Sequence, residues 1–115
     1  MITKVTGVTF INDDGISRAS IISSMSILDE IVLVRDPYNL YDSNAIKVCV
    51  KKGDKEHQIG FVEKGLASKL SPKMRKGVSF KVIVDSCGVY MDRPYCNINL
   101  IGVEYGYDGE LIFSM

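Results

Sequence analysis

The stretch from Ile31 to Val50 constrains the fold of this chain more than any other part of it. It begins with four bulky or β-branched apolar residues, Ile31 to Val34, which favour a strand. It ends with apolar residues at every second position from Ile46 to Val50, the period of a half-buried strand. The pattern predicts two neighbouring strands of one sheet, with Ile46 and Val48 in the core.

The connection between these two strands is long and polar. Pro37 holds the residue before it out of the helical region. Asn39, Asp42 and Asn44 have side chains that bond their own backbone, so they predict Asx-type turns. We therefore assign Pro37, Asn39 and Asn44 a loop-structuring role. A polar connection that carries tyrosines between rigid strands is where binding groups tend to lie.

The remainder of the chain alternates short strand patterns with turns. Apolar alternation and turn residues predict further strands over residues 4–11, 58–62, 78–84, 96–103 and 110–114. Short helices are predicted from a Ser17 cap to about Ser24, and from Glu63 to Leu70, where Ser71-Pro72 stops the helix. Residues 85–94 are expected to form a loop or a wide hairpin. The fold class is mainly β, with six or seven strands that hide their edges in a small barrel.

Length and composition limit the class of protein. The 115 residues suffice for one domain, with a core at about 5–103 and a C-terminal strand or tail at 104–115. No apolar run approaches the ~18 residues of a membrane span, and no signal peptide is visible. The odd, widely spaced Cys49, Cys87 and Cys96 predict a reducing, cytoplasmic location with free thiols. A disulfide between Cys87 and Cys96 across a hairpin is left open.

The charges are unevenly distributed, although the net charge is zero. Residues 31–80 hold ten basic and five acidic side chains, whereas the segments before and after them are both net acidic. A basic middle between acidic ends is compatible with a surface that faces phosphates. Ordinary solvated strand and helix faces explain the same distribution equally well.

Several classes of enzyme are unsupported by the motifs. The single histidine, His57, lies in a charged turn, and no nucleophilic serine motif accompanies it. The cysteines form no closely spaced pair, so we expect no metal site, and no glycine run matches a nucleotide-binding loop. Asp42, Glu63 and Lys64 have the wrong spacing for a nuclease metal site. We therefore expect no cofactor and no enzymatic activity in this chain itself.

Tyr41 and Asp42 are the strongest candidates for binding. A tyrosine face stacks a nucleic-acid base, worth about 1–3 kcal/mol, and an aspartate accepts a hydrogen bond from a hydroxyl group. The alternative is structural: Asp42 and Asn44 satisfy loop amides and Tyr41 covers the end of the barrel.

The central stretch also carries a family resemblance. The run LVRDPYNLYDSNAIKV, followed by IGFVEKGLASKL, resembles the HIRAN domain family. The resemblance extends over about Val5 to Val84. It implies an OB-like barrel and capture of single-stranded DNA at a 3′-hydroxyl end, in DNA repair or replication-fork processing. The matched positions are Leu33, Val34, Arg35, Pro37, Asn39, Tyr41, Asp42, Asn44, Ala45, Ile46, Val48, Ile59, Gly60, Ala67 and Leu70.

The resemblance also implies roles for single residues. Tyr41 and Asp42 would face the terminal nucleotide, and Lys64, with Arg35, would approach the phosphates. Thr9 and Phe10 occupy the positions of an Arg-Tyr pair, and Phe61 replaces a histidine. A ring is thus kept at Phe10, but a cation and a polar ring are missing, so we expect modest affinity.

Two functions are carried forward from the sequence. The first is a non-catalytic module that binds single-stranded DNA ends, with catalysis supplied by a helicase or nuclease partner. The alternative is a protein-interaction adaptor that recruits a separate DNA-processing enzyme through its sheet edges or its tyrosine-rich residues 103–113.

Overall fold

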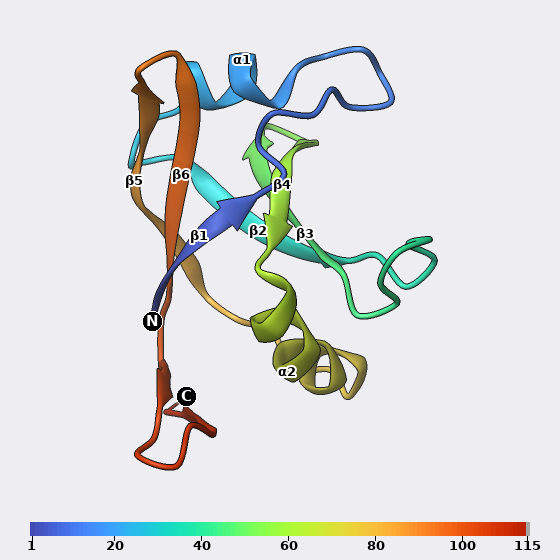
Figure 1. Ribbon diagram of the computed structural model, residues 1–115, viewed down its shortest axis with the longest axis vertical. Helices are drawn as coiled ribbons and strands as arrows, with labels where there is room; N and C mark the ends of the chain where they lie inside the picture. Colours follow the sequence, from blue (N-terminus) through green and yellow to red (C-terminus); the bar gives the residue numbers. More distant parts are fainter. Residues whose placement is uncertain (115) are drawn as a thin grey trace.

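The computed structural model describes residues 1–114, which form a mainly β fold (Figure 1). Six strands make one antiparallel sheet in the order β2-β3-β4-β1-β6-β5, and two short strands make a separate hairpin. The strands are β1 Ile2–Thr6, β2 Glu30–Arg35, β3 Ile46–Lys52, β4 Lys55–Val62, β5 Val82–Tyr90, β6 Arg93–Leu100, β7 Val103–Tyr105 and β8 Leu111–Phe113. The helices are α1 Arg18–Ser23 and α2 Lys64–Arg75. The predicted fold class is confirmed. None of the described helices is long and apolar enough to cross a membrane.

The six-stranded sheet curls so that its two edge strands, β2 and β5, approach each other. Within residues 1–114, β2 pairs with β3 alone, so its outer edge forms no ladder with β5. A groove of about 1010 Å³ lies along this seam, lined by residues 27–35, Met74 and residues 77–83. The α1 helix lies across one end of the sheet, and α2 follows β4 at the other (Figure 1).

The core lies inside the curled sheet. Ile46 and Val48 on β3 are both fully buried, as predicted. They pack in one cluster with Ile59 of β4, Leu70 of α2 and Ile22 of α1. The central hairpin therefore supplies one wall of the core, and both helices contribute to it.

Strand β3 departs from simple alternation at Cys49. A register shift against β4 falls between Val48 and Cys49, where one strand gains an extra residue. Cys49 is buried together with Val48 and Val50, although the pattern predicted it to face away from them. Burial raises the pKa of the Cys49 thiol to about 11, so this cysteine behaves as an apolar residue.

The first strand is shorter than predicted. It ends at Thr6, whereas apolar alternation indicated a strand to Ile11. Gly7 has φ of +69°, a left-handed conformation that a strand does not accommodate. Thr9 and Phe10 consequently lie in an exposed turn after β1 and not in the strand itself.

The second helix is longer than predicted. Glu63 is its N-cap and accepts hydrogen bonds from the amides of Gly65 and Leu66, at 2.8 and 3.1 Å. The helix continues through Pro72 to Arg75. A proline removes one backbone bond, yet the buried face that includes Leu66 and Leu70 holds the helix against the core.

The second half of the sheet also differs from the prediction. Strand β5 begins at Val82 and runs to Tyr90, so the predicted strand over 78–84 starts too early. Residues 85–94, expected to form a loop or a wide hairpin, form a tight β5–β6 hairpin. Met91 and Asp92, with φ of 49° and 63°, form its two-residue turn, in which both residues are left-handed.

Residues 103–113 form the β7–β8 hairpin, which packs against α2. The Phe80 and Phe113 rings lie 5.8 Å apart, and the Lys73 ammonium lies 4.8 Å from the Phe113 ring centroid. Lys69 lies over the Tyr105 ring at 5.3 Å and donates to the Gly109 carbonyl at 3.0 Å. The predicted C-terminal strand is thus one arm of this hairpin.

Cys87 and Cys96 are cross-strand partners in the β5–β6 hairpin. Both are free thiols, as is Cys49. Burial raises the pKa of the Cys96 thiol to about 12 and also raises that of Cys87. Among residues 1–114, no group of histidine, cysteine, aspartate or glutamate side chains is placed to hold a metal ion.

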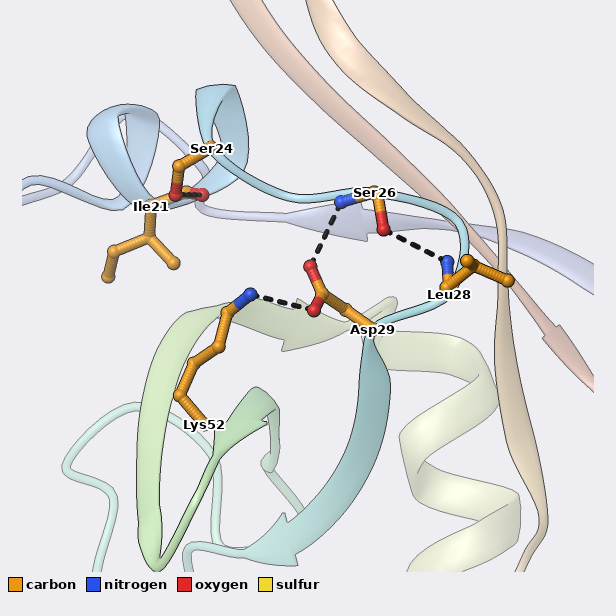
Figure 2. A network of polar contacts seen from close by, with 6 residues as sticks. All are labelled: Ile21, Ser24, Ser26, Leu28, Asp29 and Lys52. Atoms are coloured by element: carbon orange, nitrogen blue, oxygen red, sulfur yellow. Dashed lines mark hydrogen bonds and ion pairs between the residues drawn. The ribbon is translucent and has the colours of Figure 1, made fainter.

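The link between α1 and β2 is held by a small polar network (Figure 2). The Asp29 carboxylate accepts hydrogen bonds from Lys52 Nζ at 2.7 Å and from the Ser26 amide at 2.9 Å. The hydrogen bond from Lys52 lowers the pKa of Asp29 most, and the bond from the Ser26 amide lowers it further. The network joins the start of β2 to the end of β3, which fixes the edge of the sheet beside the groove.

Ser71 offers a test of the helix–core packing. Its hydroxyl is fully buried and has no hydrogen-bond partner among the described residues. We expect Ser71→Ala to raise the free energy of unfolding by about 1 kcal/mol, because an unsatisfied buried hydroxyl is costly and alanine favours a helix. Urea unfolding measures this change, and Ser68→Ala, at an exposed serine of the same helix, is the control. A loss of stability in Ser71→Ala would show that the Ser71 hydroxyl has a hydrogen-bond partner.

Candidate nucleic-acid interface

The connection between β2 and β3 is a loop braced by its own side chains. The Asp36 amide donates to the Ala45 carbonyl at 2.9 Å and closes the loop. Asn39 Oδ1 accepts from the amides of Tyr41 and Asp42, at 2.9 and 3.1 Å. These are the Asx-type bonds expected of such a sequence, and they leave the loop with a defined shape.

On this loop, the Tyr41 ring and one carboxylate oxygen of Asp42 have no partner in the described chain. The Tyr41 side chain is 92% exposed, and its ring contacts no other aromatic ring or cation within residues 1–114. Asp42 Oδ1 accepts from the Asn44 amide at 2.9 Å, while Oδ2 has no partner in the described chain. Exposed Tyr38 and Leu40 stand on either side of Asn39, and our sequence reasoning did not select them as site residues.

A second cluster forms where the turn after β1 meets β4. The Arg18 guanidinium carbon lies 5.8 Å from the Phe10 ring centroid and 5.4 Å from that of Phe61. Arg18 Nη1 donates to the Gly7 carbonyl and Nε donates to Asn12 Oδ1, both at 2.8 Å. The guanidinium therefore lies within cation–π distance of two aromatic rings, a favourable arrangement.

Local folding of residues 7–18 places Arg18 in this cluster. The Arg18 amide donates to the Phe10 carbonyl at 3.1 Å, so the chain folds back on itself before α1. The Asn12 side chain then donates to the Gln58 carbonyl of β4 at 2.8 Å. A Cβ atom on Gly7 would lie 3.3 Å from Arg18 and 3.6 Å from Phe61, so the close fit depends on glycine.

Arg18 carries a charge that is buried without a carboxylate partner. Its residue exposure is 8%, and burial lowers the pKa of its guanidinium, although the Asp13 charge opposes this effect. In the described chain, Lys52 and Asp29 form the salt bridge, and Arg18 bonds only neutral oxygens. A buried cation of this kind is costly unless an anion approaches it.

The predicted site residues fall into separate groups. Phe10 and Phe61 share the Arg18 cluster, with Thr9 exposed in the adjoining turn. The loop with Tyr41 and Asp42 leads into β3, where Lys47 pairs with Phe61 of β4. Both loops project to the same side in Figure 1, but no hydrogen bond or ring contact joins the two groups within residues 1–114.

The predicted cations are more dispersed. Lys64 is exposed at the first position of α2, two residues after β4 ends. At the other end of α2, Arg75 Nη1 donates to Asn44 Oδ1 at 3.3 Å, which ties this helix to the loop. Arg35 lines the groove between β2 and residues 77–83, where its Nε is buried without a partner. Arg35 thus lies apart from the Phe10–Phe61 cluster.

The comparisons with known proteins identify the family. The model of the HIRAN domain matches residues 4–104. The chain belongs to the HIRAN domain family. This is a family of DNA-binding domains that are not catalytic themselves.

Two solved structures resemble this HIRAN domain. The crystal structure of the HIRAN domain of human HLTF has a TM-score of 0.60 at 23% identity, over 87% of this chain and 71% of that one. A crystal structure of a protein from Lactobacillus plantarum has a TM-score of 0.55 at 16% identity, over 86% and 90% of the two chains. At these identities the likeness shows the fold. No curated protein sequence matches significantly.

Arg18 is a further residue of this HIRAN domain that was not selected from the sequence. The prediction was that no cation stands near Phe10, because Thr9 occupies the family's arginine position. The structure places a cation there from α1. A local signal was present, since Gly7 and the Ser17 cap both mark a chain reversal, but neither signal shows where the arginine points.

Proposed function

We propose that this HIRAN domain binds single-stranded DNA ends and recognises a terminal 3′-hydroxyl. The observation that carries the proposal is the loop between β2 and β3. It presents an exposed Tyr41 ring beside an Asp42 carboxylate that keeps one oxygen free. The internal bonds of the loop hold both residues in place before any ligand arrives, which reduces the entropy lost on binding.

The chemistry of the pair suits a hydroxyl end. The Tyr41 ring would stack on the terminal base, and such stacking is sequence-tolerant because every base has a flat face. The free Asp42 oxygen would accept the proton of the 3′-hydroxyl. A terminal phosphate would instead bring negative charge against this carboxylate, which costs about 1 kcal/mol at 4 Å even in water.

The surrounding residues support an approach by the phosphate backbone. Phe10 and Phe61 would wall the binding surface, and the exposed Lys64 and the half-buried Lys47 would neutralise phosphates. Such a module would bring a helicase or nuclease partner to a strand end during DNA repair or fork processing. The partner would supply the catalysis.

The direct test compares three single strands of one sequence. Fluorescence anisotropy with a 5′ label would measure binding of a strand ending in 3′-hydroxyl and of the same strand ending in 3′-phosphate. Competition by an unlabelled circular strand would complete the series. We expect the hydroxyl end to bind most tightly, and binding to weaken as salt rises. Equal affinity for the three strands would refute end recognition.

Substitutions at the pair should separate stacking from hydroxyl recognition. We expect Tyr41→Ala to weaken binding by about 1–3 kcal/mol through the lost stack. Asp42→Asn should keep the bond to the Asn44 amide while removing the charge, so that the preference for hydroxyl over phosphate narrows. Anisotropy on both ends measures each effect, and Tyr107→Ala, at an exposed tyrosine outside this loop, is the control. An unchanged preference in Asp42→Asn would contradict the assigned role.

A second candidate is a protein-interaction adaptor. The observation in its favour is the unpaired outer edge of β2 beside the groove of about 1010 Å³. An edge of this kind accepts an added strand from another protein. Salt separates the two functions, because an apolar peptide contact would resist concentrations that release single-stranded DNA.

A further inference from the structure

We propose that Arg18 is the cation that binds the phosphate nearest the captured DNA end, taking the place of the family arginine that Thr9 lacks. The inference rests on the proposed function and adds a residue to it. Arg18 comes from α1, not from the end of β1, so the same charge would reach the site from a different element.

The hydrogen bonds of Arg18 leave one end of its guanidinium free. Nε and Nη1 donate to Asn12 Oδ1 and to the Gly7 carbonyl. Nη2 has no partner among residues 1–114, and it is not among the nitrogens enclosed without a partner, so it reaches solvent. The free donor lies on a side chain that is otherwise more than nine-tenths buried.

The surroundings of this free donor favour an anion. Both hydrogen-bond acceptors of Arg18 are neutral, and Asp13, the acidic side chain whose charge acts on Arg18, forms no ion pair with it. A phosphate oxygen at Nη2 would form a charge-assisted hydrogen bond and neutralise a buried charge at the same time. Because two bonds and two rings already fix the guanidinium, binding would order little further.

The position of Arg18 selects a backbone phosphate over a base. Its guanidinium carbon already lies 5.8 and 5.4 Å from the centroids of the Phe10 and Phe61 rings, which leaves less room for a base to stack on it. The nitrogen left without a partner in the described chain is Nη2, a hydrogen-bond donor that suits the oxygens of a phosphate. The exposed side of the Phe10 ring, which is 65% exposed, stays available to the strand.

A purely structural Arg18 would behave differently. In that case it would hold Phe10 and Phe61 in place, and its loss would weaken binding without changing the number of ions released. If it binds phosphate, its loss should remove about one phosphate contact, which lowers the slope of log K against log salt by about 0.7 for a single strand.

The test combines a variant with a change in the DNA. Arg18→Met and the wild type would be titrated with a 3′-hydroxyl strand and with the same strand carrying a neutral methylphosphonate at its last linkage. We expect Arg18→Met to weaken binding of the normal strand about ten- to a hundredfold. The substitution should also lower the slope of log K against log salt by about 0.7. The affinity of Arg18→Met should be nearly the same for the normal strand and for the methylphosphonate strand.

Matched controls make the outcome specific. Arg93→Met removes an exposed arginine in the β5–β6 hairpin and should leave affinity and slope unchanged. A methylphosphonate at the first linkage should affect the wild type and Arg18→Met equally. An unchanged salt slope in Arg18→Met, or full sensitivity to the terminal methylphosphonate, would overturn the phosphate role while leaving end recognition intact. Failure of the wild type to bind any end would instead refute the proposed function.

A second measurement covers the case in which Arg18→Met does not fold. The Arg18 Nε–H group is held by Asn12, so it should give a resolved signal in a nitrogen–proton spectrum of the wild type. We expect this signal to shift on saturation with the normal strand and to shift much less with the methylphosphonate strand. Equal shifts with both strands, or none with either, would overturn the inference.

Discussion

Gly60→Ala is expected to destabilise this HIRAN domain strongly. An added Cβ would lie 2.2 Å from the Thr6 carbonyl oxygen and 2.5 Å from Val5 Cγ1, distances that real Cβ atoms do not adopt. Gly60 lies in β4 between β3 and β1, where it pairs with Val48 on one side and β1 passes on the other. The clash falls on backbone, which cannot move without breaking the pairing of β1 with β4.

The free energy of unfolding is expected to fall by about 3 kcal/mol or more, which is at or above the upper end of the cost of overpacking a protein core. A small domain has roughly 5–15 kcal/mol in total, so this loss is a large share of its stability. Chemical unfolding followed by circular dichroism measures it. The control is Gly53→Ala, at a turn with φ of +62° and open space around the Cβ position, which should cost about 1–2 kcal/mol from backbone strain alone. A smaller loss at Gly60 than at Gly53 would contradict the close approach of β1.

The need for glycine at position 60 could not be predicted from the local sequence. The resemblance to HIRAN domains matched this glycine, but the physical need for it lies in β1, more than fifty positions earlier in the chain. The same holds for Arg18, whose partners are Gly7, Asn12, Phe10 and Phe61. Contacts between distant segments depend on how the sheet is ordered, and local patterns do not encode that order.

Local chemistry, in contrast, was readable in the central hairpin. Alternation from Ile46 to Val50 predicted two of the buried residues on β3, and the Asx residues predicted the internal bonds of the loop. The prediction went wrong where one signal in the sequence was outweighed by another or by packing against the core. Gly7 ended β1 despite continued alternation, and core packing carried α2 through Pro72.

The second large effect is expected for Ile46→Ala. Ile46 is fully buried at the start of β3 and pairs with Arg35 of β2, so truncation leaves a cavity beside the first rung of the hairpin. Such substitutions cost about 2–5 kcal/mol in free energy of unfolding, from lost transfer energy and the cavity together. Ile46→Val should cost only about 0.5–1.5 kcal/mol, because a single methylene group is removed.

Lys47→Ala is the control for Ile46→Ala on the opposite face of the same strand. Lys47 is half-buried and outside the core cluster, so its truncation should change stability by less than about 0.5 kcal/mol. Urea unfolding of the three variants would show which face of β3 is buried. Similar losses of stability at positions 46 and 47 would contradict the assigned face.

Since the loop of Tyr41 and Asp42 is held by its own bonds, the folded fraction of Ile46→Ala should keep its preference for a 3′-hydroxyl end. Loss of that preference at temperatures where the variant is folded would mean that the core, and not the loop, positions the binding pair.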